Sequence, residues 1–166
     1  ARNLGNIPFP NQASELELRR VANKLKETVA KVQELSRLEI VELGEASALD
    51  RRILFEKHLI SLEHAQDGNN RLAMISEDES ISIMVNEEDH IRIQTLLPGF
   101  QLGKAYELAD NIDDLLESKL DYAFDEKIGY ITACPTNVGT GLRVSIMVHL
   151  PALVVTGQAK TILSAV

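Results

Sequence analysis

Apolar residues recur every three or four positions in two long stretches of the chain, and this spacing predicts two amphipathic helices. The first stretch covers residues 14–35 and opens with Ser14 and Glu17, the capping-box pair that satisfies free backbone amides at a helix start. The second follows two glycines and ends at Leu120. Its apolar positions are Ala105, Leu108, Ala109, Ile112, Leu115, Leu116 and Leu120, and those of the first are Leu18, Val21, Ala22, Leu25, Val29 and Val32.

Two shorter stretches also have helical character. Residues 158–166 predict a helix at the end of the chain, and residues 46–60 predict one that is followed by a turn at residues 67–70. The core candidates of the 46–60 helix are Leu49, Ile53, Leu54 and Leu59.

Alternating apolar and polar residues predict β-strands in three places. Residues 72–86 predict a hairpin with its polar tip at residues 77–79, and residues 128–133 predict a further strand. Residues 143–150 predict another strand, with one buried apolar face and Arg143 on the more polar face. The positions on its apolar face are Val144, Ile146, Val148 and Leu150.

The order of these elements predicts an α+β domain built on an antiparallel sheet flanked by helices. A chain of 166 residues with 45% hydrophobic residues fits a single domain that covers residues 1–166. The chain starts just before Arg2 without a leading element, and it stops inside residues 158–166 without a helix cap. We therefore expect the domain to be incomplete at both ends.

Charge and cysteine content narrow the classes of function. A formal net charge of -8 argues against direct binding of nucleic acid and suits a basic partner, although such a surface more often serves only solubility. No apolar run approaches the roughly 20 residues needed to span a bilayer. Cys134 is the single cysteine, which excludes an internal disulfide and suits a reducing compartment. We expect a soluble, cytoplasmic protein without a membrane partner.

The segment NEEDHIR at residues 86–92 places three carboxylates in a row, before a histidine and an arginine. Like charges this close are unfavourable unless a positive group is meant to bind there, and a cationic substrate or Mg²⁺ would be such a group. The alternative is a solvated acidic turn that caps a following helix.

The segment CPTNVGTGLR at residues 134–143 combines two glycines with two threonines in a loop between predicted strands. Such a loop exposes backbone amides and hydroxyls, and Arg143 adds a forked donor set that suits phosphate. The alternative is a simple glycine-rich connection in which Cys134 is buried as a small apolar residue.

Together the two segments suit phosphoryl transfer to a guanidinium. A guanidinium has a pKa of about 13.8, so it is a poor nucleophile until carboxylates align it and withdraw a proton. The transferred phosphoryl group and the departing ADP need positive donors and Mg²⁺, and Arg92 and Arg143 are candidate donors. The Cys134 thiolate is a candidate negative partner for the guanidinium.

NEEDHIR and CPTNVGTGLR resemble the two signature segments of the ATP:guanido phosphotransferases, which include the arginine and creatine kinases. ARNLGNIPFP at residues 1–10 and HLPAL at residues 149–153 extend the resemblance over the whole chain. The resemblance implies a guanido-kinase catalytic domain with a glutamine-synthetase-like fold, and ATP and Mg²⁺ as cofactors. It names no residue that binds the metal directly.

Within this family the chain resembles the bacterial protein-arginine kinases of the McsB type. Phosphagen kinases usually carry a W-P-x-G-R-G-I stretch before NEEDH, whereas residues 71–85 read RLAMISEDESISIMV. The resemblance implies arginine residues of proteins as acceptors, with a CtsR-type repressor, a McsA-type activator and ClpC as partners. It also implies a homodimer formed through a carboxy-terminal region beyond residue 166.

The resemblance also implies roles for individual residues. Glu88 matches the carboxylate that orients and deprotonates the guanidinium, and Cys134 matches the cysteine that contacts the substrate. For the nucleotide, His58 matches a histidine beside the adenine, and Arg92 and Arg143 match arginines that hold the phosphates. The adjoining nucleotide-contact stretch matches Val144, Ser145, Ile146 and Met147. From its surroundings in the sequence alone, His58 would be an ordinary histidine on a helix surface.

Two arginine-bearing family segments would lie outside residues 1–166, one before Ala1 and one after Val166. The later one also carries the second catalytic carboxylate, so we expect this chain alone to be inactive or nearly so. Two other functions remain open. One is a small-molecule guanidino kinase that makes phosphoarginine, and the other is a non-catalytic adaptor that binds a partner through its acidic surface.

Overall fold

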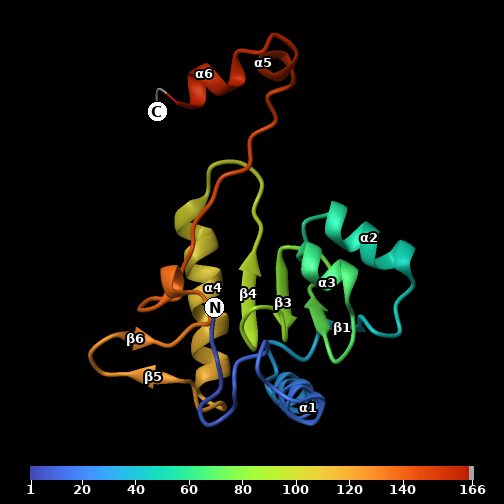
Figure 1. Ribbon diagram of the computed structural model, residues 1–166, viewed down its shortest axis with the longest axis vertical. Helices are drawn as coiled ribbons and strands as arrows, with labels where there is room; N and C mark the ends of the chain where they lie inside the picture. Colours follow the sequence, from blue (N-terminus) through green and yellow to red (C-terminus); the bar gives the residue numbers. More distant parts are fainter. Residues whose placement is uncertain (165–166) are drawn as a thin grey trace.

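A four-stranded antiparallel sheet forms the centre of the computed structural model, which describes residues 1–164 (Figure 1). The strands are β1 (Glu39–Glu42), β2 (Leu72–Ile75), β3 (Ile81–Val85) and β4 (Ile91–Thr95), in this order across the sheet. Val85 pairs with Leu72 on one side and with Ile91 on the other. The end of β3 therefore lies in the middle of the sheet, and the NEEDHIR segment begins directly after it.

Helices cover both faces of this sheet. α1 (Glu15–Lys31) and α4 (Leu102–Glu117) share one apolar core with alternate residues of β2 and β3, including Leu72, Met74 and Ile83. α2 (Ala48–Glu56) and α3 (Leu62–Gln66) lie on the other face, where the intervening residues of the same strands form a second core. Because successive side chains of a strand point to opposite faces of the sheet, the apolar residues of β2 and β3 contribute to both cores.

The two long predicted helices are confirmed. Ser14 caps α1 through the predicted capping box, in which the backbone amide of Ser14 donates to Oε2 of Glu17 over 2.7 Å. α1 ends four residues before the predicted residue 35 and α4 starts three residues before Ala105. The shorter α2 forms as well, but Leu49 and Ile53 are 67% and 44% exposed, so their assignment to the core was wrong. Leu54 and Leu59 do pack inward.

The predicted hairpin forms from β2 and β3, and Glu79 at its tip has a positive φ of 58°. Two strands of the central sheet were missed. β1 is short and exposed on three of its four residues, so it lacks a clear alternation. No element was predicted for residues 91–95, and only the alternative explanation of the acidic segment placed a helix after it, whereas these residues form β4 and pair with β3.

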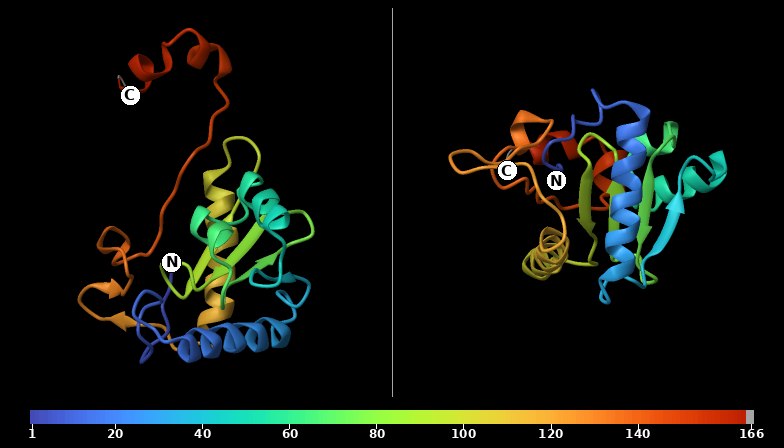
Figure 2. Two further views of the ribbon diagram at one scale, coloured as in Figure 1. Left: turned by 45° about the vertical axis from the view of Figure 1, so that its right-hand side comes forward. Right: turned by 90° about the horizontal axis from the view of Figure 1, so that it is seen from below.

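The carboxy-terminal third differs most from the prediction. Of residues 128–133, only Gly129–Tyr130 forms a strand, β6, which pairs with β5 (Phe124–Asp125). Residues 143–150 are extended but form no ladder with any part of residues 1–164, and the apolar face predicted to be buried is exposed. Beyond them, α5 (Pro151–Val155) and α6 (Ala159–Leu163) stand apart from the sheet (Figure 2). α6 occupies part of the helix predicted at 158–166, of which residues 165–166 lie outside the described range.

Every helix within residues 1–164 is too short or too polar to cross a lipid bilayer.

Candidate active site

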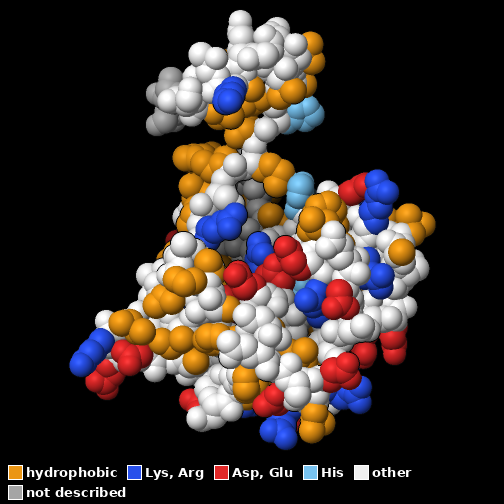
Figure 3. Space-filling view, viewed as in Figure 1, with side chains coloured by type: hydrophobic (Ala, Val, Ile, Leu, Met, Phe, Trp, Pro, Cys, Tyr) orange, Lys and Arg blue, Asp and Glu red, His pale blue; other side chains and the backbone are white. Residues whose placement is uncertain are grey.

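A cavity of about 760 Å³ lies between β4, α4 and parts of residues 137–147. Acidic and basic side chains meet around a hollow on the face shown in Figure 3. Seven of the nine predicted site residues line this cavity, namely His58, Glu88, Arg92, Arg143, Val144, Ser145 and Met147. Cys134 and Ile146 are the two that do not.

The NEEDHIR segment turns sharply because Asn86 takes a left-handed backbone conformation, with a φ of 61°. The backbone amide of Asn86 donates to the carbonyl of His90 over 3.0 Å, which closes the turn. The Asn86 side chain donates to the carbonyl oxygens of Leu18 on α1 and Asn70 before β2, over 2.9 and 2.7 Å. One asparagine therefore joins the turn to two other segments.

His90 and Asp89 attach the turn to the beginning of the chain. The amide of Leu4 donates to Nδ1 of His90 over 3.1 Å, so Nε2 carries the proton and donates to the carbonyl of Pro8 over 3.0 Å. Burial lowers the pKa of His90, which keeps its ring neutral. Asp89 accepts hydrogen bonds from the Asn3 side chain over 2.6 Å and from the backbone amide of Ala133 over 2.7 Å.

Glu87 is held by Arg92. Nη1 of Arg92 lies 3.1 Å from both carboxylate oxygens of Glu87, whose side chain is only 9% exposed. Burial by itself would raise the pKa of Glu87, but the charge and hydrogen bonds of Arg92, together with a hydrogen bond from Ser61, lower it below its usual value. Glu87 is therefore ionised, and the rest of the Arg92 guanidinium remains directed to the cavity.

Glu88 is the exception among the three carboxylates. It is exposed and lines the cavity, and it makes no hydrogen bond or ion pair with any other residue in the part of the chain that the structure describes. Its two neighbours are occupied in holding the turn together. The sequence could not separate the three, because the partners of Asp89 lie 86 and 44 positions away in the chain.

The cysteine loop, residues 134–143, starts one residue after Ala133, whose amide donates to Asp89. Cys134 is half-buried and precedes a short 3₁₀ helix, Pro135–Asn137, and its Sγ lies 2.9 Å from Oγ1 of Thr136. The loop closes where Gly139 and Tyr130 exchange backbone hydrogen bonds of 2.9 and 3.1 Å. A Cβ on Gly129 would lie 2.6 Å from the Gly139 carbonyl oxygen, so this crossing requires a glycine.

Arg143 and His58 also line the cavity. Arg143 is exposed and has no side-chain partner within residues 1–164, while Val144, Ser145 and Met147 continue along the wall beside it. His58 follows α2 with a φ of 61°, and the Gln94 side chain donates to its carbonyl over 2.5 Å.

One part of the cavity was not predicted from the sequence. Arg2 and Asp113 form an ion pair in which both side chains are nearly buried, and the Arg2 guanidinium lies 3.5 Å from the centre of the Tyr130 ring. Burial raises the pKa of Asp113 and the charge of Arg2 opposes this rise. The sequence did offer one signal for this ion pair, because Asp113 follows directly after Ile112 of the apolar stripe of α4.

The family of the chain follows from its similarity to known proteins. Residues 20–166 match the model of the family described as "ATP:guanido phosphotransferase, C-terminal catalytic domain". The chain belongs to the ATP:guanido phosphotransferase family.

Curated relatives are identical to this chain at about half of the aligned positions. A "Protein-arginine kinase" of Symbiobacterium thermophilum is 52% identical over 162 residues, which are 96% of this chain and 46% of that protein. Another from Brevibacillus brevis is 49% identical over 168 residues, covering 100% of this chain and 47% of that protein. The chain therefore spans about half the length of the curated relatives that it matches.

Two solved structures confirm the predicted fold class. The substrate-free duplicated taurocyamine kinase from Schistosoma mansoni superimposes with a TM-score of 0.76 at 23% identity, covering 84% of this chain and 21% of that one. A lombricine kinase gives 0.71 at 19% identity, covering 84% of this chain and 43% of that one. At these identities the likeness concerns the fold alone.

Proposed function

We propose that the protein containing this chain transfers the γ-phosphoryl group of ATP to the guanidinium of arginine residues in proteins. The observation that carries the proposal is the free Glu88 carboxylate, which faces a cavity also lined by Arg92 and Arg143. A carboxylate that holds no part of the fold is available for a cationic substrate, and two guanidinium groups nearby are available for phosphate. The curated relatives named protein-arginine kinases support a protein as the acceptor.

In the proposed reaction, Glu88 aligns the substrate guanidinium and accepts one of its protons as the nitrogen attacks the γ-phosphorus. The N–P bond forms while the bond between the γ-phosphorus and the oxygen of ADP breaks, and ADP leaves with the electron pair. Arg92 and Arg143 stabilise the negative charge on the phosphoryl oxygens during this step. Cys134 contacts the guanidinium from the loop next to the cavity-lining Asn137.

The cavity has the size and polarity that a nucleotide needs. Its volume lies within the range of roughly 300–1,000 Å³ that is usual for small-molecule sites. We propose that Val144 to Met147 contact the nucleotide along one wall and that His58 lies beside the adenine. Mg²⁺ would enter with the phosphates of ATP and neutralise part of their charge.

Residues outside this chain complete the site in our proposal, because the chain spans about half of its relatives. We therefore expect residues 1–166 alone to be inactive or nearly so. As implied by the resemblance to the McsB type, we also propose a cytoplasmic protein that acts on a CtsR-type repressor and works with a McsA-type activator and ClpC. A homodimer formed through the carboxy-terminal region belongs to the same proposal.

The test uses the parent-length protein with ATP, Mg²⁺ and an arginine-rich protein acceptor, and detects acid-labile phosphoarginine by mass spectrometry. Glu88→Gln should lower the rate by about 10²–10⁴-fold, the usual contribution of a general base. Glu126→Gln is the matched control, since Glu126 is exposed in the turn between β5 and β6, away from the cavity.

Other outcomes would replace the proposal. Phosphorylation of free arginine in preference to the protein acceptor would establish a small-molecule guanidino kinase. Absence of transfer to both acceptors would leave the non-catalytic adaptor.

A further inference from the structure

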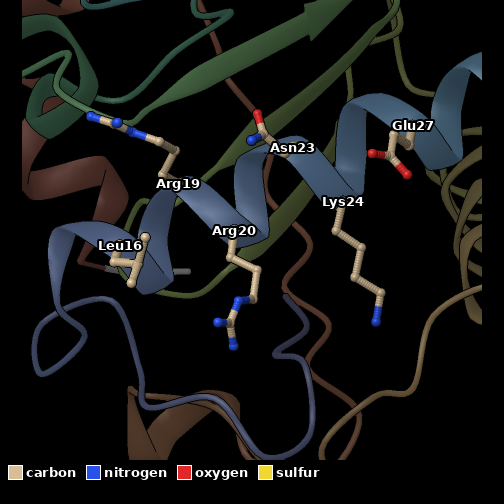
Figure 4. Close-up of a pocket in the computed structure, with 6 residues that line it drawn as sticks. All are labelled: Leu16, Arg19, Arg20, Asn23, Lys24 and Glu27. Atoms are coloured by element: carbon tan, nitrogen blue, oxygen red, sulfur yellow. The ribbon is translucent and has the colours of Figure 1, made fainter.

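The outer face of α1 carries a group of basic side chains that the phosphoryl-transfer site does not use. Arg19, Arg20 and Lys24 are exposed there and, with Leu16, Asn23 and Glu27, line a shallow hollow of about 330 Å³ (Figure 4). Arg20 and Lys24 extend from the same side of the helix, and Arg19 extends from the opposite side. We call these residues the α1 basic face.

No ion pair holds the three cations of the α1 basic face within residues 1–164, and the nearest carboxylate in the hollow is the single Glu27. Arg19, Arg20 and Lys24 take part in none of the ion pairs found among residues 1–164, whereas Glu27 is 3.7 Å from Lys31. Arg20 and Lys24 are four positions apart, and like charges at this spacing destabilise a helix. A bound anionic group would offset the repulsion between the Arg20 and Lys24 side chains.

The basic face also contrasts with the molecule that carries it. The chain has a formal net charge of -8, so three neighbouring unpaired cations form a local exception on an acidic protein. Leu16, at the start of the hollow, is 69% exposed. The surface therefore offers an apolar contact beside positive charge.

We propose that the α1 basic face is a docking surface for an acidic segment of a partner polypeptide, with an apolar residue next to its carboxylates. The carboxylates would lie on Arg20 and Lys24 on one side of the helix and on Arg19 on the other, and the apolar side chain on Leu16. A nucleic acid fits less well, because its phosphates would continue past these three cations onto a surface of the same sign.

The position of the α1 basic face allows docking while the cavity is occupied. The two surfaces share no lining residue. They are nevertheless linked, since the carbonyl of Leu18 on α1 accepts the 2.9 Å hydrogen bond from Asn86 at the start of the acidic turn. The docking surface does not depend on the proposed kinase activity.

The experiment measures fluorescence anisotropy of a labelled peptide with the repeat Glu-Glu-Leu upon titration with the parent-length protein. The combined variant Arg19→Glu, Arg20→Glu and Lys24→Glu should raise the Kd at least about tenfold, and added salt should weaken wild-type binding. The matched control reverses Arg37, Lys119 and Lys127, which are exposed cations outside both the hollow and the cavity. This control should bind the peptide like the wild type.

Three results would overturn the proposal: no binding by the wild type, equal loss in the control, or tighter binding of a poly-uridine oligonucleotide than of the peptide. A second variant with glutamine at positions 19, 20 and 24 removes the charges without reversing them, and circular dichroism reports whether α1 remains folded. If the glutamine variant folds and still binds like the wild type, the surface is not the docking site.

Discussion

The two signature segments of this ATP:guanido phosphotransferase are positioned in different ways. The acidic turn, residues 86–92, is tied to α1, to the residue before β2 and to the start of the chain through the side chains of Asn86, Asp89 and His90. The cysteine loop, residues 134–143, is held through backbone groups, by Asp89 at Ala133, by Tyr130 at Gly139 and by the start of the chain at residues 140–141. The Cys134 side chain has a hydrogen-bond contact only with Thr136 among the described residues. The turn that carries Glu88 is therefore held by more side-chain contacts than the Cys134 side chain is.

Substitution of Asp89 should reveal the largest difference between the two segments in their contribution to the free energy of unfolding. Asp89→Ala leaves the partly buried Ala133 amide without an acceptor and the buried Asn3 side chain without its partner, so we expect a loss of about 2–4 kcal/mol in the free energy of unfolding. Thr136→Val in the loop should cost less than about 0.5 kcal/mol. Urea unfolding of the parent-length protein compares the two, and equal losses would contradict the comparison.

Acid should destabilise the fold through His64, a buried residue of α3 whose Nε2 lies next to the Val85 carbonyl, just before the acidic turn. Burial, and then the positive charge of Arg71, lower the pKa of His64 to about 4 from the ordinary value of 6.5. As the pH falls through 6.5, the unfolded chain binds a proton that the native ring refuses, so stability falls until the pH reaches about 4. The loss between pH 8 and pH 5 is about 2 kcal/mol.

Urea unfolding at the two pH values measures this loss. His64→Gln is the control, because its amide can still donate to the Val85 carbonyl, which His64 Nε2 contacts at 3.1 Å. This variant should lose less stability on acidification, and an unchanged pH dependence would show that His64 is not the responsible group.

A smaller effect is expected for Glu87, which acts through Arg92. Glu87→Gln removes the charge that holds Nη1 of Arg92, so we expect the KM for ATP to rise several-fold and stability to fall by about 1 kcal/mol. Steady-state kinetics distinguishes this from Glu88→Gln, which should lower kcat. A fall in kcat as large as that of Glu88→Gln would mean that Glu87 takes part in the chemistry.

Cys134→Ser should have the smallest effect on folding. A serine hydroxyl can keep the contact with Thr136, so stability should change by less than about 0.5 kcal/mol while activity falls more clearly. Thermal unfolding and phosphoarginine formation are measured on the same samples. A large loss of stability would show that the thiol supports the loop itself.

Local sequence signals predicted the elements that depend on local interactions. The capping box of Ser14 and Glu17 and the apolar stripe of α4 gave two helices with errors of only a few residues at their ends. The 72–86 hairpin was found because both strands are apolar and the tip is polar. Residue types singled out the two site segments, whereas His58 and residues 144–147 were assigned from the family resemblance. All nine predicted site residues except Cys134 and Ile146 line one cavity.

Non-local interactions account for the misses. Alternation in residues 143–150 shows that the segment can form a half-buried strand, but a strand also needs a neighbour, and none lies beside it within residues 1–164. Leu49 and Ile53 fit the helical spacing of α2, yet that short helix presents them to solvent. The different duties of Glu87, Glu88 and Asp89 depend on partners that only the folded chain brings near.

The extended segment of residues 143–150 has a practical consequence for handling the chain. It exposes Val144, Ile146 and Val148 on one side and carries unpaired backbone groups along its length. Such a segment is a template for strand pairing between molecules, and no proline interrupts it before Pro151. Concentrated solutions of the 166-residue chain should therefore self-associate and eventually aggregate, and sedimentation should show larger species as the protein concentration rises.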